Sequence, residues 1–185
     1  GLLALEDLHL EVPEGGLYGL IGPNGAGKTT VFNLISGFLK PTRGAIHFHG
    51  RDITNLPPHE ITAQGVARTF QNIRLFAELT VLDNVLVGCH CRSRASWWEA
   101  VARLPRYGRE ERQRLGQALS LLKEVGLEEV AGEKAGQLPY GHQRRLEIAR
   151  ALALNPKLVV ADEPVSSLDV SIQAQVLNLL KELQA

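Results

Sequence analysis

The sequence predicts an α/β fold with a mainly parallel sheet, and two segments carry that prediction. Residues 22–30 read Gly-Pro-Asn-Gly-Ala-Gly-Lys-Thr-Thr and fit the pattern G-x-x-x-x-G-K-S/T. Residues 158–164 read Leu-Val-Val-Ala-Asp-Glu-Pro, an apolar run that ends in two adjacent carboxylates. A strand followed by a glycine loop and a helix is the context in which such a loop holds phosphate groups. The chain is therefore expected to bind a nucleoside triphosphate.

Apolar spacing predicts secondary structure on both sides of the glycine loop. Residues 17–21 form an apolar run, which predicts a buried strand. Residues 29–36 carry helical apolar spacing and are followed by a glycine, which predicts a helix. A further strand is expected at 45–48 and a short helix within 52–66. Residues 69–76 are expected to form a linking loop.

The composition changes near residue 78, where the pattern becomes helical and rich in Arg, Leu and Glu. Residues 78–140 are predicted to form a helical lobe, inserted into a nucleotide-binding core made of residues 1–77 and 141–185. Within the lobe, Leu115, Leu119, Leu122 and Val125 have the spacing of one helix face. The elements expected after the lobe are a helix at 143–154, a strand at 158–161 and a helix at 171–183.

The bulk composition argues against several other classes of protein. The chain has 185 residues, with 20 Lys plus Arg and 20 Asp plus Glu. A nucleic-acid-binding surface needs a clustered excess of basic residues, so no nucleic-acid partner is expected. No apolar stretch reaches the length of a membrane span. The two cysteines, Cys89 and Cys91, lack the further ligands of a tetrahedral metal site.

The glycine loop supplies the groups that hold phosphate. Gly22, Gly25 and Gly27 let the backbone turn tightly, so that its N–H groups point at phosphate oxygens. Lys28 adds a positive charge for the β- and γ-phosphates and is expected to act in both binding and catalysis, while Thr29 offers its hydroxyl to Mg²⁺. The residues predicted to contact the nucleotide here are Gly22, Pro23, Asn24, Gly25, Ala26, Gly27, Lys28, Thr29 and Thr30.

The two carboxylates after the apolar run at 158–161 are assigned separate roles. Asp162, at the carboxyl end of the predicted strand, is expected to hold Mg²⁺ directly or through water. Glu163 is the candidate general base that orients or deprotonates the attacking water. The alternative is a pair of carboxylates that caps a following helix.

Together with two further segments, these motifs resemble those of the ATP-binding subunits of ABC transporters. The glycine loop, residues 69–72, residues 138–143 and residues 162–164 occur in that family's order. The resemblance implies a P-loop NTPase fold with ATP and Mg²⁺ as cofactors. It also implies that Gln71 contacts Mg²⁺ and the attacking water. The signature-segment residues that would bind a nucleotide held by a second subunit are Tyr140, Gly141, His142 and Gln143.

The same resemblance implies partners and a location. A second ATP-binding subunit, identical or different, would complete a head-to-tail dimer that encloses two ATP molecules. Transmembrane permease subunits would dock near Gln71 and the helical lobe. The chain would then lie at the cytoplasmic face of the cell membrane and contact the membrane only through the permease.

Two parts of the chain resemble different branches of this family. The first 155 residues are most similar to subunits of branched-chain amino-acid importers, whereas residues 160–175 are more similar to those of oligopeptide and dipeptide importers. The main hypothesis is an ATPase subunit that powers a branched-chain amino-acid importer through ATP-driven dimerisation. The alternatives are an oligopeptide importer subunit, a nucleotide-binding fragment without effective hydrolysis, and a soluble ABC-type ATPase that acts on nucleic acid or ribosomes.

Three departures from the family pattern affect these expectations. Pro139 stands where the common signature has serine. All histidines precede Glu163, so the switch histidine of the family has no counterpart, and the chain begins after the place of the aromatic that stacks on adenine. The chain is therefore expected to be cut at both ends, with marginal stability and weak hydrolysis when alone.

Overall fold

The computed structural model describes residues 4–70, 72–90, 105–162 and 173. The chain divides into two compact units, which are Gly1–Val66 with Asp169–Ala185, and Ala67–Leu168. The predicted helix at 171–183 and the site residues Gln71 and Glu163 lie outside the described residues, apart from the helical residue Gln173.

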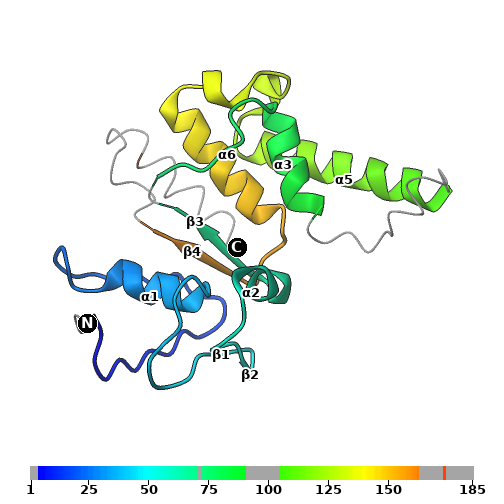
Figure 1. Ribbon diagram of the computed structural model, residues 1–185. Helices are drawn as coiled ribbons and strands as arrows, with labels where there is room; N and C mark the ends of the chain where they lie inside the picture. Colours follow the sequence, from blue (N-terminus) through cyan, green and yellow to red (C-terminus); the bar gives the residue numbers. More distant parts are fainter. Residues whose placement is uncertain (1–3, 71, 91–104, 163–172, 174–185) are drawn as a thin grey trace. The chain divides into compact units, whose positions relative to one another are not determined.

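The described residues of the first unit form the glycine loop and four short elements, labelled in Figure 1. These are α1 (Lys28–Ile35), β1 (His47–Phe48), β2 (Arg51–Asp52) and α2 (Pro58–Gln64). β1 and β2 pair antiparallel, with His47 opposite Asp52. A proline in its first turn suits α2, because the N–H that proline lacks would have no partner within the helix.

A glycine allows close packing where α1 ends. Gly37 has a φ of 75°, and a β-carbon there would lie 2.7 Å from the side chain of Ile61 on α2. It would also lie 2.9 Å from the carbonyl oxygen of Leu56. Ile61 is itself buried. The predicted helix at 29–36 is confirmed within one residue at each end, and its stop has a steric cause.

The prediction of a buried strand at 17–21 is wrong. These residues form no strand, and Ile21 is 95% exposed. A strand needs a neighbour to pair its N–H and C=O groups. Among the described residues of this unit, β1 and β2 pair only with each other. The strand expected at 45–48 is likewise reduced to His47–Phe48.

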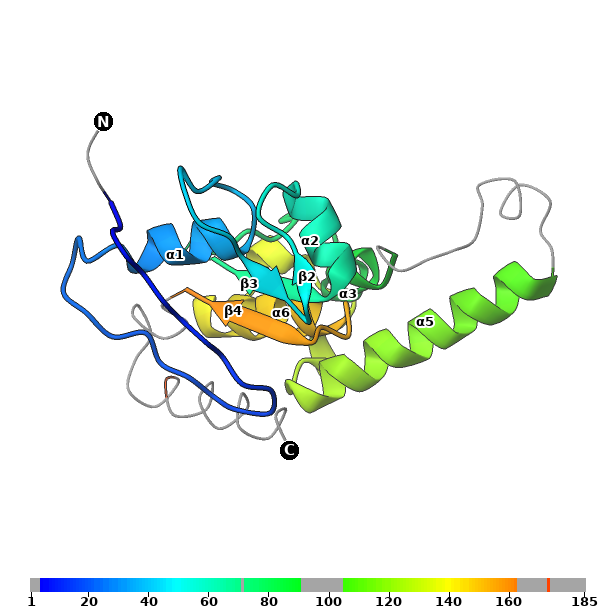
Figure 2. The same cartoon turned by 90° about the horizontal axis from the view of Figure 1, so that it is seen from below.

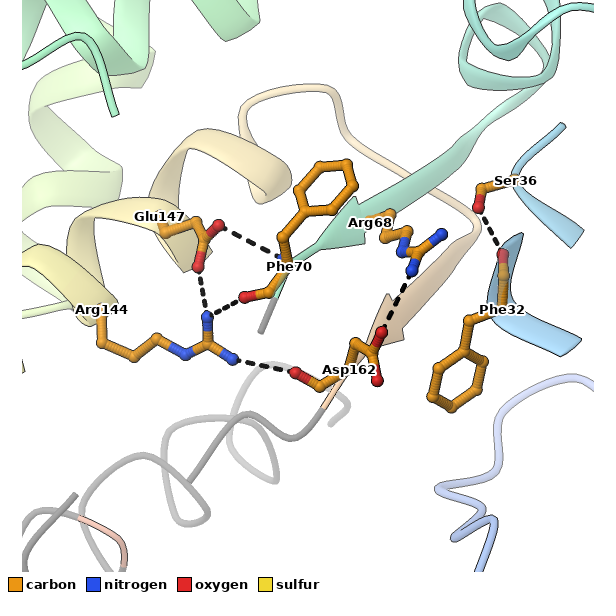
Figure 3. Close-up of polar contacts among 7 residues, drawn as sticks. All are labelled: Phe32, Ser36, Arg68, Phe70, Arg144, Glu147 and Asp162. Carbon is orange, nitrogen blue, oxygen red and sulfur yellow. Dashed lines mark hydrogen bonds and ion pairs between the residues drawn. The ribbon is translucent and has the colours of Figure 1, made fainter. Parts of the chain in front are cut away.

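The described residues of the second unit form a two-stranded sheet and three longer helices. β3 (Val66–Thr69) begins at the last residue of the first unit and pairs with β4 (Leu158–Ala161), as predicted for 158–161. Figure 3 draws the two arrowheads at the same end, so the strands run parallel. The helices are α3 (Val81–His90), α5 (Pro105–Glu124) and α6 (Tyr140–Leu152), with 3-10 turns at Glu128–Val130 and Ala135–Gln137.

The core of this unit lies where α3, α5 and α6 meet. Gly88 allows α3 to pack tightly against α6, because a β-carbon there would lie 2.7 Å from the carbonyl oxygen of Arg150 on α6. Apolar side chains on all three helices are buried there, namely Val81, Val85, Ala118, Leu122, Leu146 and Ala149. α3 and α5 fall within the predicted lobe of 78–140, whose boundaries stay a prediction.

Only half of the apolar face predicted on α5 is buried. Leu122 and Val125 are 0% and 2% exposed, whereas Leu115 and Leu119 are each 38% exposed. In Figure 2, the amino-terminal part of α5 projects away from α3 and α6. No described helix has the length and apolar character that crossing a membrane requires.

α6 begins three residues earlier than the predicted helix at 143–154. Pro139 stands just before it with φ −54° and ψ 147°, and its carbonyl accepts from the N–H groups of His142 and Gln143. The proline therefore starts the helix at Tyr140. As a result, Tyr140, Gly141, His142 and Gln143 all lie in its first turn.

We expect Asn84→Ala to lower the free energy of unfolding by about 2–4 kcal/mol. Asn84 is fully buried, and its amide accepts from the N–H of Phe76 at 2.9 Å. It also donates to the carbonyls of Phe76 and Thr80 at 3.1 and 2.9 Å. Urea unfolding followed by circular dichroism measures the loss.

Glu78→Ala is the matched control in the same segment. Its ion pair with Lys134 spans 2.8 Å, but the two side chains are 86% and 53% exposed. We expect a loss below about 1 kcal/mol, because solvent screens exposed pairs. Equal losses for the two variants would contradict the role given to the buried amide.

Candidate functional site

The glycine loop in the first unit has a backbone that only glycine adopts without strain. Gly25 and Gly27 both have a φ of 84°, in the left-handed region. A β-carbon on Gly27 would also lie 2.7 Å from the side chain of Leu5 and 3.0 Å from the carbonyl oxygen of Ala4. Gly27 is the residue directly before α1, so this conformation sets the direction in which the helix leaves the loop.

The side chain of Lys28 folds back over this loop. Its Nζ donates to the carbonyl oxygens of Gly22 at 2.6 Å and Pro23 at 2.9 Å. The N–H of Ala26 donates to the same Pro23 carbonyl at 3.2 Å, which closes the turn. An ammonium group has three protons, so Lys28 holds the loop with two and retains one for another acceptor.

The start of α1 favours a negatively charged ligand. Helix α1 has no acidic residue in its first turn, so no side-chain carboxylate offsets the positive end of the helix there. Thr29 is exposed in that turn, and residues 23–26 of the loop are also exposed. Backbone N–H groups, a lysine and a helix end thus occupy one accessible segment, the arrangement that binds phosphate in other proteins.

In the second unit, Asp162 follows β4 and is buried, with 3% of its surface exposed. Its Oδ2 accepts from Nη2 of Arg68 on β3 at 3.0 Å, and the two side chains are 5% and 6% exposed. Figure 3 shows the two strands presenting these side chains to each other. The carboxylate predicted to bind metal therefore forms a buried ion pair, which the sequence analysis did not anticipate.

A second buried ion pair lies on α6, between Arg144 and Glu147, at 2% and 1% exposed. Nη1 of Arg144 also donates to the carbonyl of Phe70 at 2.6 Å, and Nη2 approaches the carbonyl of Asp162 at 3.4 Å. Glu147 in turn accepts from the N–H of Phe70 at 3.3 Å. We call Arg144 and Glu147 the α6 clamp, since they hold the carboxyl ends of β3 and β4 together (Figure 3).

The α6 clamp forms hydrogen bonds to the residues that directly precede two predicted site residues. Phe70 directly precedes Gln71, and Asp162 directly precedes Glu163. Arg68, Arg144 and Glu147 were not among the site residues predicted from the sequence. A signal was present for two of them, because Arg144 and Glu147 have opposite charges and stand three residues apart in a segment predicted to be helical.

The predicted signature segment forms the first turn of α6. Tyr140 is 44% exposed, whereas Gly141 is buried. The side-chain amide of Gln143 donates to the carbonyl of Leu138 at 2.9 Å, so this residue helps to fix the start of the helix. The first turn contains no acidic residue. A role in binding the nucleotide of another subunit stays a prediction.

The predicted metal ligands have the chemistry that Mg²⁺ favours. Asp162 offers a carboxylate and Thr29 a hydroxyl, both hard oxygen donors. Within residues 4–70, 72–90, 105–162 and 173, no three side chains of His, Cys, Asp or Glu converge on a common point. Thr29 and Asp162 belong to different units, so their approach to one metal stays a prediction.

Comparison with known proteins then identifies the family. The description of the ABC transporter family matches residues 5–166 of this chain. The chain belongs to the ABC transporter family. Its motifs are therefore those of an ABC ATPase, as the resemblance in the sequence implied.

Named relatives align along the whole chain. The high-affinity branched-chain amino acid transport ATP-binding protein BraF of Pseudomonas aeruginosa is 43% identical over 185 residues, covering 100% of this chain and 72% of BraF. The corresponding protein LivG of Escherichia coli K12 is 41% identical over 184 residues, with coverage of 100% and 72%.

Solved ABC structures share the fold. A nucleotide-free ATP-binding cassette from an ABC transporter has a TM-score of 0.77 at 35% identity, covering 94% of this chain and 68% of that one. A dimeric cassette in a post-hydrolysis state, bound to ADP and Pi, has a TM-score of 0.78 at 32% identity, with coverage of 98% and 75%. The predicted P-loop NTPase fold is confirmed.

We expect Arg144→Met to lower the free energy of unfolding by about 3–5 kcal/mol, because it leaves Glu147 buried without its counter-charge. Arg144→Met combined with Glu147→Gln should cost less than the two single losses added together, since the double variant buries no isolated charge. Chemical unfolding of all four proteins gives the coupling. Strict additivity of the two losses would show that the α6 clamp is not an energetic unit.

Proposed function

We propose that this chain binds and hydrolyses ATP as a subunit of an importer for branched-chain amino acids. One observation carries the nucleotide part of the proposal. The Lys28 ammonium lies over a loop whose glycines Gly25 and Gly27 have left-handed backbone conformations. This loop directly precedes α1, and the first turn of α1 contains no acidic residue. The amino-acid part is supported by relatives that are named as branched-chain amino acid transport proteins and align over the whole chain, tail included.

The loop would bind the triphosphate largely through its backbone. N–H groups between Gly22 and Thr29 would donate to the β- and γ-phosphates, and Lys28 would contribute its remaining proton and its charge. This arrangement favours phosphoryl transfer, because positioning and charge neutralisation carry most of its catalysis.

Asp162 and Thr29 would hold Mg²⁺, with Gln71 as a further contact. When bound, the metal would neutralise charge on the phosphates. Burial fixes the position of Asp162 at the end of β4, and the α6 clamp holds its backbone. This fixed carboxylate supports the assignment of Asp162 as the protein's acidic ligand.

Glu163 would act as general base on the attacking water. Its carboxylate would take a proton from the water as the oxygen bonds to the γ-phosphorus and the bond to the β-phosphate oxygen breaks. The products are then ADP and inorganic phosphate. Because Glu163 is covalently next to Asp162, the carboxylate that holds the metal and the carboxylate that accepts the proton would be ordered by the same strand.

A second ATP-binding subunit would complete the site. The first turn of α6 would present its N–H groups and positive helix end to the γ-phosphate on the partner. The absence of acidic residues from that turn supports this role, and so does the dimeric cassette at 32% identity. Transmembrane permease subunits would dock near Gln71, placing the chain at the cytoplasmic face of the membrane.

Lys28→Ala should weaken ATP binding about 10- to 100-fold, the equivalent of one charge-assisted hydrogen bond. Calorimetric titration of ATP into the variant measures this loss. Lys40→Ala removes an exposed lysine from the same unit and serves as the control, with unchanged affinity expected. Unchanged binding by Lys28→Ala would remove the glycine loop from the nucleotide site.

Glu163→Gln should keep ATP binding and lose about 10²- to 10⁴-fold in turnover, the usual contribution of a general base. The variant should also dimerise when ATP is added, because bound ATP is no longer consumed. Phosphate release gives the turnover, and light scattering gives the mass. Near-normal turnover would exclude Glu163 as the base, and an ATP-bound monomer would contradict the proposed dimer.

A further inference from the structure

The buried pair of Arg68 and Asp162 puts a cation where the proposed function needs a metal ligand. Nη2 of Arg68 lies 3.0 Å from Oδ2 of Asp162, and neither side chain is more than 6% exposed. Two opposite charges that are both withdrawn from water interact strongly, and removing one of them leaves the other uncompensated. Removing Arg68 would therefore leave the Asp162 carboxylate without its buried counter-charge.

A divalent cation at Asp162 would meet the guanidinium at short range. A guanidinium that bonds to one carboxylate oxygen carries its positive charge within a few ångströms of any ion on the other oxygen. Screening by water is weak for groups this buried, so the repulsion is substantial. Arg68 and a metal ion would compete for the same negative charge.

Arg68 has a second partner to which it can shift. Its Cζ lies 5.0 Å from the centre of the Phe70 ring, within the range of a cation–π interaction. Arg74 lies over the same ring, with its Cζ at 4.4 Å. The Phe70 ring is thus an aromatic surface that holds a guanidinium near Asp162 without requiring the ion pair.

We propose that Arg68 is a positioning residue that neutralises Asp162 in the metal-free chain and competes with Mg²⁺ for that carboxylate. Arg68 then sets how strongly ATP binding depends on Mg²⁺. This inference rests on the proposed function, because it requires Asp162 to be a ligand of the nucleotide's metal. Arg68 is neither a ligand nor a base in any of the motifs identified in the sequence.

Removal of Arg68 should change the dependence of ATP binding on Mg²⁺ in a definite direction. Without Arg68, Asp162 would repel ATP that carries no metal and would attract the Mg²⁺ complex more strongly. The ratio of ATP affinity in Mg²⁺ to ATP affinity in EDTA would therefore rise. If Arg68 only held Asp162 in place as a ligand, its loss would misplace the carboxylate and the ratio would fall.

The test measures that ratio for the whole chain by calorimetric titration of ATP, in excess Mg²⁺ and in EDTA. We expect Arg68→Gln to raise the ratio at least about tenfold, as the loss of a buried like charge beside a divalent ion implies. Arg74→Gln is the matched control, since Arg74 contacts the same ring and forms no ion pair with Asp162. Its ratio should stay within about twofold of wild type.

A fall in the ratio for Arg68→Gln, or no change, would overturn the inference while leaving the proposed function intact. A wild-type chain that binds ATP equally well with Mg²⁺ and with EDTA would instead reject the metal role of Asp162, and the inference with it. If Arg68→Gln does not fold, Arg68→Lys replaces it. Lysine keeps the positive charge but lacks the planar guanidinium that stacks on an aromatic ring, so the ratio should rise by a smaller factor, and a fall or no change is again decisive.

Discussion

The ion pair between Arg144 and Glu147 is the constraint on which the second unit depends. Both side chains are almost fully buried, so each charge must find partners inside the protein. They find them in the backbone of Phe70 and Asp162, at the ends of the two strands. Because these partners lie within the protein, the contacts hold the helix and both strand ends in one arrangement relative to one another.

The two units fix their predicted site residues by different physical means. In the first unit, backbone conformation shapes the glycine loop. Gly27 has a positive φ, and the neighbouring atoms leave no room for a side chain there. In the second unit, charged side chains fix Asp162. Arg68 pairs with its carboxylate, and Arg144 contacts its backbone carbonyl. The glycine loop is open to solvent and the carboxylate is not. An exposed loop suits a ligand that enters and leaves, whereas a buried carboxylate suits a ligand point that must not move.

Local sequence patterns predicted some elements well and others badly. The strand at 158–161 and the helix after the glycine loop were predicted within a residue, because turn residues bound each of them. The strand at 17–21 failed because an apolar run says nothing about whether a pairing partner is present. Leu115 and Leu119 lie on the predicted apolar face but are exposed, because a helical face is buried only as far as the neighbouring helices extend.

The sequence by itself determined the family, the glycine loop and the pair of adjacent carboxylates after β4. These depend on residue type at fixed short spacing, which survives without knowledge of the fold. Only the tertiary structure showed that Arg68 neutralises Asp162 and that Arg144 with Glu147 ties Phe70 to Asp162. The contact of Arg68 with Asp162 and the contacts from α6 to Phe70 join residues that lie 74–94 positions from each other in the chain. The contact from α6 to Asp162 spans a shorter stretch of sequence. Burial then turns ordinary charged residues into obligatory partners, and burial is a property of packing that no local pattern encodes.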